Sequence, residues 1–143
     1  MKAATIYKRS GRIFIHSLSK TSVGIWMGGA PWFSVDAMNS NEVGRMIREC
    51  INESREGIPQ PLSFDSIFSP ILELAGLKSY GTFAKSARCV QVRAADDCNV
   101  VFTPTRNEGA DGGFSPLPLK YQASIDSGAE LGRVALQALN ESE

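Results

Sequence analysis

The feature that most constrains this chain is a helix-like segment that occurs twice. Residues 42–54 return as residues 130–142, 88 positions later, and six of the thirteen positions are identical. In both copies apolar residues recur three and four positions apart, which is the pattern of an amphipathic helix with one buried face. Because both copies have the same apolar face, we expect two helices in equivalent places of a duplicated fold.

Short polar residues stand three positions before each repeat. Asn39 precedes Glu42, and Ser127 precedes Glu130. At this spacing the short side chain accepts a hydrogen bond from the first helical turn, and the carboxylate reaches back toward the cap. The spacing predicts helices over residues 40–54 and 127–142.

Runs rich in β-branched and aromatic residues precede each predicted helix. Ser10-Gly11 separates the first two runs as a two-residue hairpin turn, and residues 96–99 supply turn residues in the second half. We expect strands at 5–9, 12–18, 24–29 and 32–36, and again at 88–93, 99–106, 114–117 and 120–126. The predicted fold class is α/β in the α+β sense, with two ββββα repeats, mainly antiparallel sheets and a helical insert between the repeats.

The 143 residues suffice for a single domain with its own core. We expect repeat unit 1 at about 1–54, the insert at about 55–86 and repeat unit 2 at about 87–143. Within the insert, Ser69 as cap and Pro70 at the first helical position start a short helix that Gly76 ends. A second short helical piece is expected at 79–86, with Phe83 as its anchor.

The composition indicates a protein of the cytoplasm. No apolar run approaches the length of a membrane span, and the first residues lack the apolar stretch of a secretory signal, so we expect no membrane partner. The three cysteines, Cys50, Cys89 and Cys98, show no C-x-x-C spacing. We interpret them as reduced thiols rather than as a disulfide framework.

No motif marks a catalytic or cofactor site. His16 is the single histidine, which disfavours histidine-based metal sites, and the cysteines are too dispersed for a zinc cluster. His16 and Ser17 are adjacent on a predicted strand and should point to opposite faces, so they cannot pair as base and nucleophile. The glycine-rich segments match no phosphate-binding motif. We therefore expect no enzyme, no metal, no cofactor and no small-molecule substrate.

The formal net charge of zero hides an uneven distribution. Residues 1–35 contain five basic side chains and no acid: Lys2, Lys8, Arg9, Arg12 and Lys20. This set is either a solvated strand face or a nucleic-acid surface, and the near-neutral pI of 6.6 argues against nucleic acid as a partner. Trp26, Trp32 and Phe33 are likewise either core aromatics or a base-stacking platform.

Several segments taken together resemble a family of bacterial immunity proteins from contact-dependent growth inhibition (CDI) systems. They are Ile13-Phe-Ile-His-Ser-Leu-Ser-Lys-Thr21, Thr82-Phe-Ala-Lys85, Thr103-Pro-Thr-Arg-Asn107 and the two Glu-x-Gly-Arg helices. The resemblance covers nearly the whole chain. It implies a small cytoplasmic antidote that binds the cognate toxin domain, often a nuclease, at the C-terminus of a contact-delivered effector.

An antidote needs a rigid surface whose charges match the toxin, and two surfaces are candidates. One is acidic and would stand in for phosphates: Asp96, Asp97, Glu108 and Asp111. The other contains the residues that match the family's segments: His16, Ser17, Lys20, Thr21, Lys85, Thr105 and Arg106. Each of these residues has the alternative role of simply holding the fold.

The duplicated ββββα plan also resembles the Whirly fold, which is known for binding single-stranded DNA. The sequence has no clear Lys-Gly-Lys-Ala-Ala-Leu type of motif. Neutralisation of a toxin is therefore the first expectation, and a module that binds single-stranded nucleic acid is the alternative.

Overall fold

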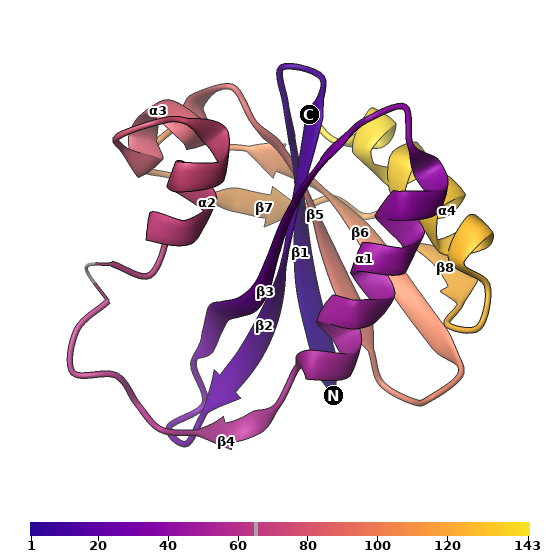
Figure 1. Ribbon diagram of the computed structural model, residues 1–143, viewed down its shortest axis with the longest axis horizontal. Helices are drawn as coiled ribbons and strands as arrows, with labels where there is room; N and C mark the ends of the chain where they lie inside the picture. Colours follow the sequence, from indigo (N-terminus) through magenta and orange to yellow (C-terminus); the bar gives the residue numbers. More distant parts are fainter. Residues whose placement is uncertain (65) are drawn as a thin grey trace.

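The computed structural model describes residues 1–64 and 66–143, which form a mixed α+β structure (Figure 1). Its elements in chain order are β1 (Lys2–Arg9), β2 (Arg12–Thr21), β3 (Trp26–Asp36), α1 (Ser40–Glu53), β4 (Glu56–Ile58), α2 (Ser69–Ala75), α3 (Tyr80–Lys85), β5 (Arg88–Ala94), β6 (Asn99–Asn107), β7 (Phe114–Pro116), β8 (Tyr121–Ser124) and α4 (Gly128–Glu141). The predicted fold class is confirmed.

The strands form one sheet in the order β3-β2-β1-β5-β6-β7, with β4 beside β2 and β8 beside β6. All pairs are antiparallel except β2 with β4. The β1–β5 pair joins the two halves of the chain at the centre of the sheet, so the halves share one continuous layer.

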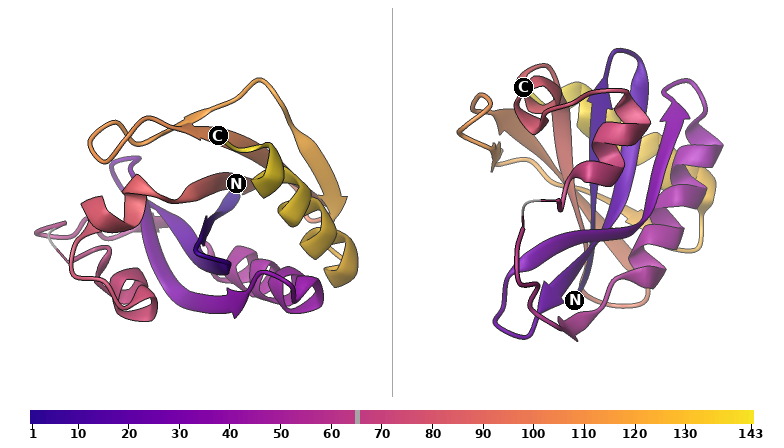
Figure 2. Two further views of the ribbon diagram at one scale, coloured as in Figure 1. Left: turned by 90° about the horizontal axis from the view of Figure 1, so that it is seen from above. Right: turned by 60° about the vertical axis from the view of Figure 1, so that its left-hand side comes forward.

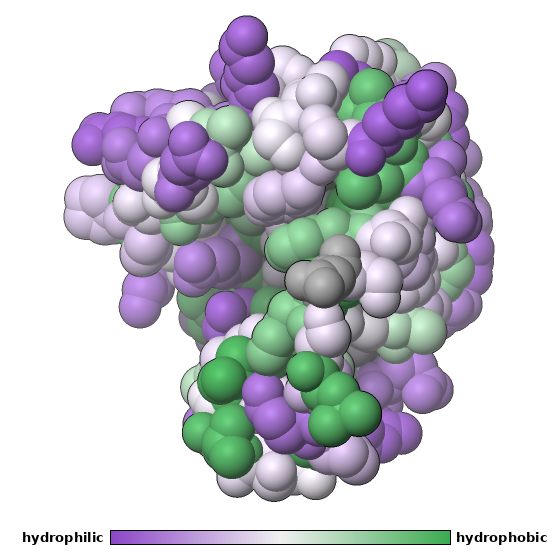
Figure 3. Space-filling model, turned by 90° about the vertical axis from the view of Figure 1, so that its left-hand side faces the viewer, coloured by the Kyte–Doolittle hydropathy of each residue, from purple (hydrophilic) through white to green (hydrophobic). Residues whose placement is uncertain are grey.

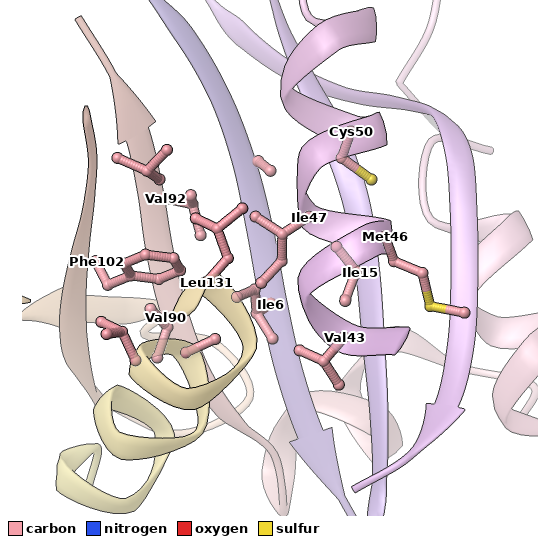
Figure 4. Close-up of a cluster of buried hydrophobic side chains, with 14 of the residues drawn as sticks. Ile6, Ile15, Val43, Met46, Ile47, Cys50, Val90, Val92, Phe102 and Leu131 are labelled. Carbon is pink, nitrogen blue, oxygen red and sulfur yellow. The ribbon is translucent and has the colours of Figure 1, made fainter. Parts of the chain in front are cut away.

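Helices α1 and α4 lie side by side on one face of this sheet (Figures 1 and 2). Their bounds differ by 88 residues at both ends, as the repeated segment predicts. Between helices and sheet lies the main hydrophobic core, in which Ile47 and Leu131 meet Val90 and Phe102 (Figure 4). All four side chains are fully buried, so this layer contributes most of the apolar burial of the fold.

The two helices touch backbone to backbone at equivalent glycines. A Cβ on Gly44 would lie 1.8 Å from the carbonyl oxygen of Gly128, and a Cβ on Gly132 would lie 1.8 Å from that of Ser40. Residues 40 and 128 are themselves 88 positions apart. The glycine of the repeated Glu-x-Gly-Arg motif is therefore the point at which the two copies pack on each other.

Both helices have the predicted side-chain caps, although the Glu42 carboxylate accepts from Arg45 rather than reaching back to the cap. The Asn39 side chain accepts from the Glu42 amide at 3.4 Å, and the Ser127 hydroxyl accepts from the Glu130 amide at 3.2 Å. The serine after each helix is also used in both copies. Buried Ser54 accepts from the Ala3 amide and donates to the Leu18 carbonyl.

Its counterpart Ser142 ties α4 to the neighbouring strands in the same way. The buried hydroxyl donates to the carbonyl of Cys89 at 3.1 Å or to that of Ala138 at 3.0 Å, and it accepts from the Thr105 amide at 3.4 Å. The last identical residue of the repeat thus fastens each helix to the sheet.

The insert covers part of the opposite face of the sheet (Figure 2). Phe83 of α3 is fully buried against Tyr7 and Phe14, with ring centroids 5.2 and 5.4 Å away, so its predicted role as anchor is confirmed. Gly76 ends α2 in the left-handed conformation, as expected, with φ of 70°. The predicted cap was wrong by one position, because Ser69 is already helical and Phe68 is the cap residue.

The first unit differs from the prediction in its strand count. The sequence predicts two strands at 24–29 and 32–36, but residues 26–36 form the single strand β3, and residues 24 and 25 lie in the preceding turn. A register shift between His16 and Ser17 accommodates the extra residues opposite β2, and the Ala30–Pro31 peptide within this bulge is cis. In the second half the equivalent segments are separate strands, because residues 117–120 form a loop between β7 and β8.

Candidate functional site

Four of the predicted partner-binding residues are buried. His16, Ser17, Thr21 and Thr105 are each at most 3% exposed. The Ser17 hydroxyl donates to the Cys50 carbonyl at 2.8 Å, and the Thr105 hydroxyl donates to the Cys89 carbonyl at 2.6 Å. These side chains hold the fold and present no surface to a partner.

His16 lies in an aromatic sandwich rather than at an exposed strand end. Its ring centroid is 4.5 Å from that of Trp32 and 5.8 Å from that of Tyr7. Nδ1 lies 2.9 Å from the Ser17 carbonyl oxygen, while Nε2 is buried and has no hydrogen-bond partner within the described residues. Burial lowers the pKa of His16 to about 4, so the ring is neutral at pH 7.

The exposed candidates divide between the two ends of the sheet. Asp96 and Asp97 lie in the β5–β6 turn, whereas Glu108 and Asp111 lie in the β6–β7 loop. β6 has nine residues, so these acids are separated by the length of a strand, about 30 Å. The predicted acidic set is therefore not brought together on one face.

Local contacts account for two of these exposed residues. Asp96 accepts from the amides of Cys98 and Asn99, both at 2.8 Å, and these backbone hydrogen bonds hold its pKa below the usual range. Arg106 forms an ion pair with Glu143 at 3.0 Å. Lys85 is exposed at the end of α3, near the same end of the sheet as Arg106.

A different surface emerges where the insert leaves the second face of the sheet uncovered. We call it the Trp26 surface, and its half-buried members are Leu18, Lys20, Trp26, Gln91 and Arg93. Lys20 and Trp26 are direct cross-strand partners, whereas Gln91 and Arg93 come from β5 on the far side of β1. In Figure 3 the molecule is hollowed on this side, between an upper part that carries α2 and α3 and a lower part that carries β4.

Two cations flank the indole at the centre of this surface. The Lys20 ammonium lies 5.7 Å and the Arg93 guanidinium carbon 5.5 Å from the Trp26 ring centroid. Both distances suit cation–π attraction. Burial lowers the pKa of Arg93, which nevertheless stays charged at pH 7. The result is a positively charged aromatic platform.

Apolar side chains continue this platform at the β2–β3 turn. Val23 and Ile25 are 65% and 45% exposed, and Leu62 in the following linker is fully exposed. Ile58 of β4 binds this turn to the linker, because its carbonyl accepts from the Ser22 amide at 2.9 Å. Apolar residues gather on the lower part of the view in Figure 3. Exposed apolar groups rimmed by charge are typical of protein-binding surfaces.

Two of the three cysteine thiols are buried and poorly placed for chemistry. Burial raises the pKa of Cys50 and of Cys89 to about 12, so neither thiol forms the nucleophilic thiolate at pH 7. All three cysteines are free, as predicted. Among the described residues, no three His, Cys, Asp or Glu side chains are grouped closely enough to hold a metal ion.

The sequence prediction missed most of the Trp26 surface. Trp26 was recognised only as a possible stacking group, and Gln91 and Arg93 were not singled out. The available signal was the alternation in β5, where Val90 and Val92 face the helices and the intervening residues must face the other way. Which part of that other face the insert leaves open follows only from tertiary structure.

Comparison with known proteins shows similarity at the level of fold. No protein-family profile and no curated protein matches the sequence. Among solved structures, a protein of unknown function from Neisseria meningitidis matches with a TM-score of 0.81 and 14% identity, over 99% of this chain and 95% of that one. A chain of the CdiA-CT/CdiI toxin and immunity complex from Yersinia pseudotuberculosis matches with the same TM-score and identity, over 99% and 97%.

The second match confirms a resemblance in fold to one chain of a CDI toxin and immunity complex. Over the described residues, none of the helices combines the length and apolar character that crossing a bilayer requires.

Proposed function

We propose that this protein is a CDI immunity protein, which binds the C-terminal toxin domain of a contact-delivered effector in the cytoplasm and neutralises it without catalysis. The observation that carries the proposal is the similarity over 99% of the chain to a chain of a CdiA-CT/CdiI complex. The family resemblance of residues 13–21, 82–85 and 103–107 supports it independently of the fold comparison.

The Trp26 surface is the proposed docking site. A large, half-buried aromatic group beside cations matches the composition of energetic hot spots, in which Trp and Arg dominate. Its attachment to three strands keeps it rigid, which lowers the entropy cost of binding. The exposed Val23 and Ile25 extend the surface with apolar area that a partner would cover.

The flanking cations define what the toxin should present to this site. Lys20 and Arg93 have no ion-pair partner within the part of the chain that is described. A toxin segment that carries carboxylates beside an apolar or aromatic group would complement them. Such pairing favours fast association and discriminates between toxins. The exposed acids Asp96, Asp97, Glu108 and Asp111 stay as alternative contacts for a basic toxin.

Co-expression tests the proposal. The toxin fragment encoded immediately upstream is induced in cells that also express this protein or an empty vector. We expect growth to stop with the vector and to continue with the protein. Continued growth arrest despite verified expression of the folded protein would reject the proposed function.

Variants then locate the docking site. Trp26→Ala combined with Arg93→Gln should abolish protection, whereas Lys120→Gln, which changes an exposed cation outside this surface, should leave it intact. Circular dichroism and urea unfolding establish that each variant is folded. Protection that survives the double substitution would assign docking to another face while leaving the immunity function in place.

Single-stranded nucleic acid binding is the second candidate, because an indole between two cations also suits a stacked base. The structure reduces the size of the predicted basic surface, since Lys8, Arg9 and Arg12 lie at the opposite end of β2 from Lys20. Oligonucleotide binding that weakens steeply with salt would favour this candidate. No measurable binding at low salt would remove it.

A further inference from the structure

A second charged feature lies at the opposite end of the sheet from the Trp26 surface. The β1–β2 turn and the start of β5 enclose an open cavity of about 300 Å³. Its lining is Lys8, Arg9, Ser10, Gly11, Ser86 and Arg88, which includes three cations and no acid. At about 30 Å³ per water molecule, the cavity holds about ten waters, which is ample room for a small tetrahedral anion.

Strand register forces two of these cations together. Lys8 and Arg88 are directly opposite each other in the antiparallel β1–β5 pair. Side chains at such positions share a face, with Cβ atoms about 5 Å apart, and like charges there destabilise a sheet. The sequence therefore retains a repulsive pair at the end of the β1–β5 ladder, where an acid on either strand would be favourable.

Nothing in the described part of the chain neutralises this cluster. None of the five ion pairs involves Lys8, Arg9 or Arg88. The Nε atom of Arg9 is buried and has no hydrogen-bond partner. The cluster therefore has no counter-charge of its own among the described residues.

In the equivalent β5–β6 turn of the second repeat, the turn's own backbone amides bind a charged side chain. Positions 8 and 9 correspond, 88 residues later, to Asp96 and Asp97. Asp96 is satisfied locally by two backbone amides at 2.8 Å. The acidic turn thus has a structural explanation for its charge, whereas the basic turn has none.

We propose that this cavity binds a phosphate dianion, with Lys8, Arg9 and Arg88 as its charged ligands. Charge-assisted hydrogen bonds to a phosphate would remove the Lys8–Arg88 repulsion. The Ser10 and Ser86 hydroxyls at the cavity wall are available as further donors. The ligand is either free phosphate or a terminal phosphate monoester on a larger molecule. The site is separate from the proposed toxin-docking surface.

A phosphate titration followed by amide NMR tests this site at pH 7 and constant ionic strength. We expect saturable shifts confined to residues 8–11 and 86–88. The double variant Lys8→Gln with Arg88→Gln should weaken binding about tenfold or more, since it removes two charge-assisted hydrogen bonds. Lys120→Gln is the matched control and should bind phosphate as the natural chain does.

Unfolding provides a readout that a merely exposed basic patch would not move. In chloride alone the double variant should be more stable than the natural chain, because the repulsive pair is gone. Added phosphate should raise the urea midpoint of the natural chain, and of Lys120→Gln, but not that of the double variant.

A second titration distinguishes the sources of phosphate. A nucleoside 5′-monophosphate that binds as tightly as phosphate would identify a terminal phosphate on a larger molecule, whereas binding of phosphate alone would identify the free ion. Amides that do not shift, shifts that persist in the double variant, or binding of an unphosphorylated ten-nucleotide strand in preference to phosphate would each overturn the proposal.

Discussion

The two copies of the repeat agree at the contact between α1 and α4 but differ in charge at the β1–β2 and β5–β6 turns. At the crossing, Gly44 and Gly132 are identical and fill equivalent places, each against a carbonyl of the other helix. At the turns, Lys8 and Arg9 occupy the positions that Asp96 and Asp97 occupy in the second copy. The copies are thus alike at the helix crossing and opposite in charge at these two turns.

This difference teaches which positions the fold constrains. A side chain at the crossing would collide with a backbone carbonyl, for which no rearrangement short of separating the helices gives room. A turn residue has no such neighbour, so its charge is free to serve binding. At the glycines of the crossing, identity between the repeats therefore follows from packing, whereas the opposite charges of the turns have no packing cause.

The largest expected effect breaks the symmetric part of the comparison. Gly44→Ala and Gly132→Ala should each destabilise the protein by about 3 kcal/mol or more, because the added Cβ overlaps a carbonyl oxygen. Urea unfolding measures the loss. Gly29→Ala is the control, because a Cβ there meets no atom within 4 Å. Equal costs at the two crossing glycines would support equivalence, and a neutral Gly44→Ala would contradict the packing.

The bulge between β2 and β3 has no counterpart in the second repeat. His16, which lies beside this bulge, gives the next largest expected effect on stability. The pKa of His16 is about 4 in the folded protein and about 6.5 in the unfolded chain. The unfolded chain therefore binds the proton first, and stability falls as pH drops from 6.5 toward 4, by about 3 kcal/mol in total.

Urea unfolding between pH 7 and 5 isolates this contribution. His16 is the single histidine, and the carboxylates Glu42, Glu56 and Asp96 lose their contributions only at lower pH, because their pKa values are lowered. His16→Phe should flatten the pH dependence in this range, whatever its effect on stability at pH 7. An unchanged slope would show that His16 is not the group responsible.

The serines that fasten the two helices to the sheet should behave alike. Ser54→Ala and Ser142→Ala each remove a buried hydroxyl that both donates and accepts, at a cost of about 1–3 kcal/mol. Ser115→Ala, on the short strand β7, is a control with a small expected effect. A large cost for one helix-end serine and none for the other would break the equivalence of the copies.

The smallest expected effect on stability comes from Ser10 in the β1–β2 turn. Ser10 has a φ of 52°, in the left-handed region that asparagine tolerates better than serine. Ser10→Asn should raise stability by about 0.5 kcal/mol. Thermal unfolding in chloride, with Ser22→Asn as a control substitution, measures the gain. A loss of stability would mean that the Ser10 hydroxyl already satisfies a structural need.

The sequence predicted the periodic parts of this fold well, for physical reasons. Both long helices follow from the apolar stripes and from the caps at Asn39 and Ser127, which are local interactions. The junction of the halves through β1 and β5 required tertiary structure, since strand pairing depends on contacts far apart in sequence. The bulge that makes residues 26–36 one strand also lacked a local signal, because Gly28-Gly29 and Pro31 indicate a break as readily as a bulge.

The candidate site was predicted less completely, because burial decides which polar residues are available. The segment 13–21 resembles the immunity family, yet most of its polar side chains serve the interior. Lys20 is the member that reaches the Trp26 surface, and its neighbour Arg93 came from a strand with no motif. The sequence does not show whether a polar strand residue is available to a partner until the elements that cover each face of the sheet are known.

Inhibition of the purified toxin domain by the purified chain tests the central claim most directly. The activity of the toxin encoded immediately upstream is titrated with this protein at a toxin concentration well above the expected Kd. The account predicts a linear loss of activity that ends at one equivalent, with no turnover by this protein itself. Full toxin activity in the presence of excess folded protein would contradict it.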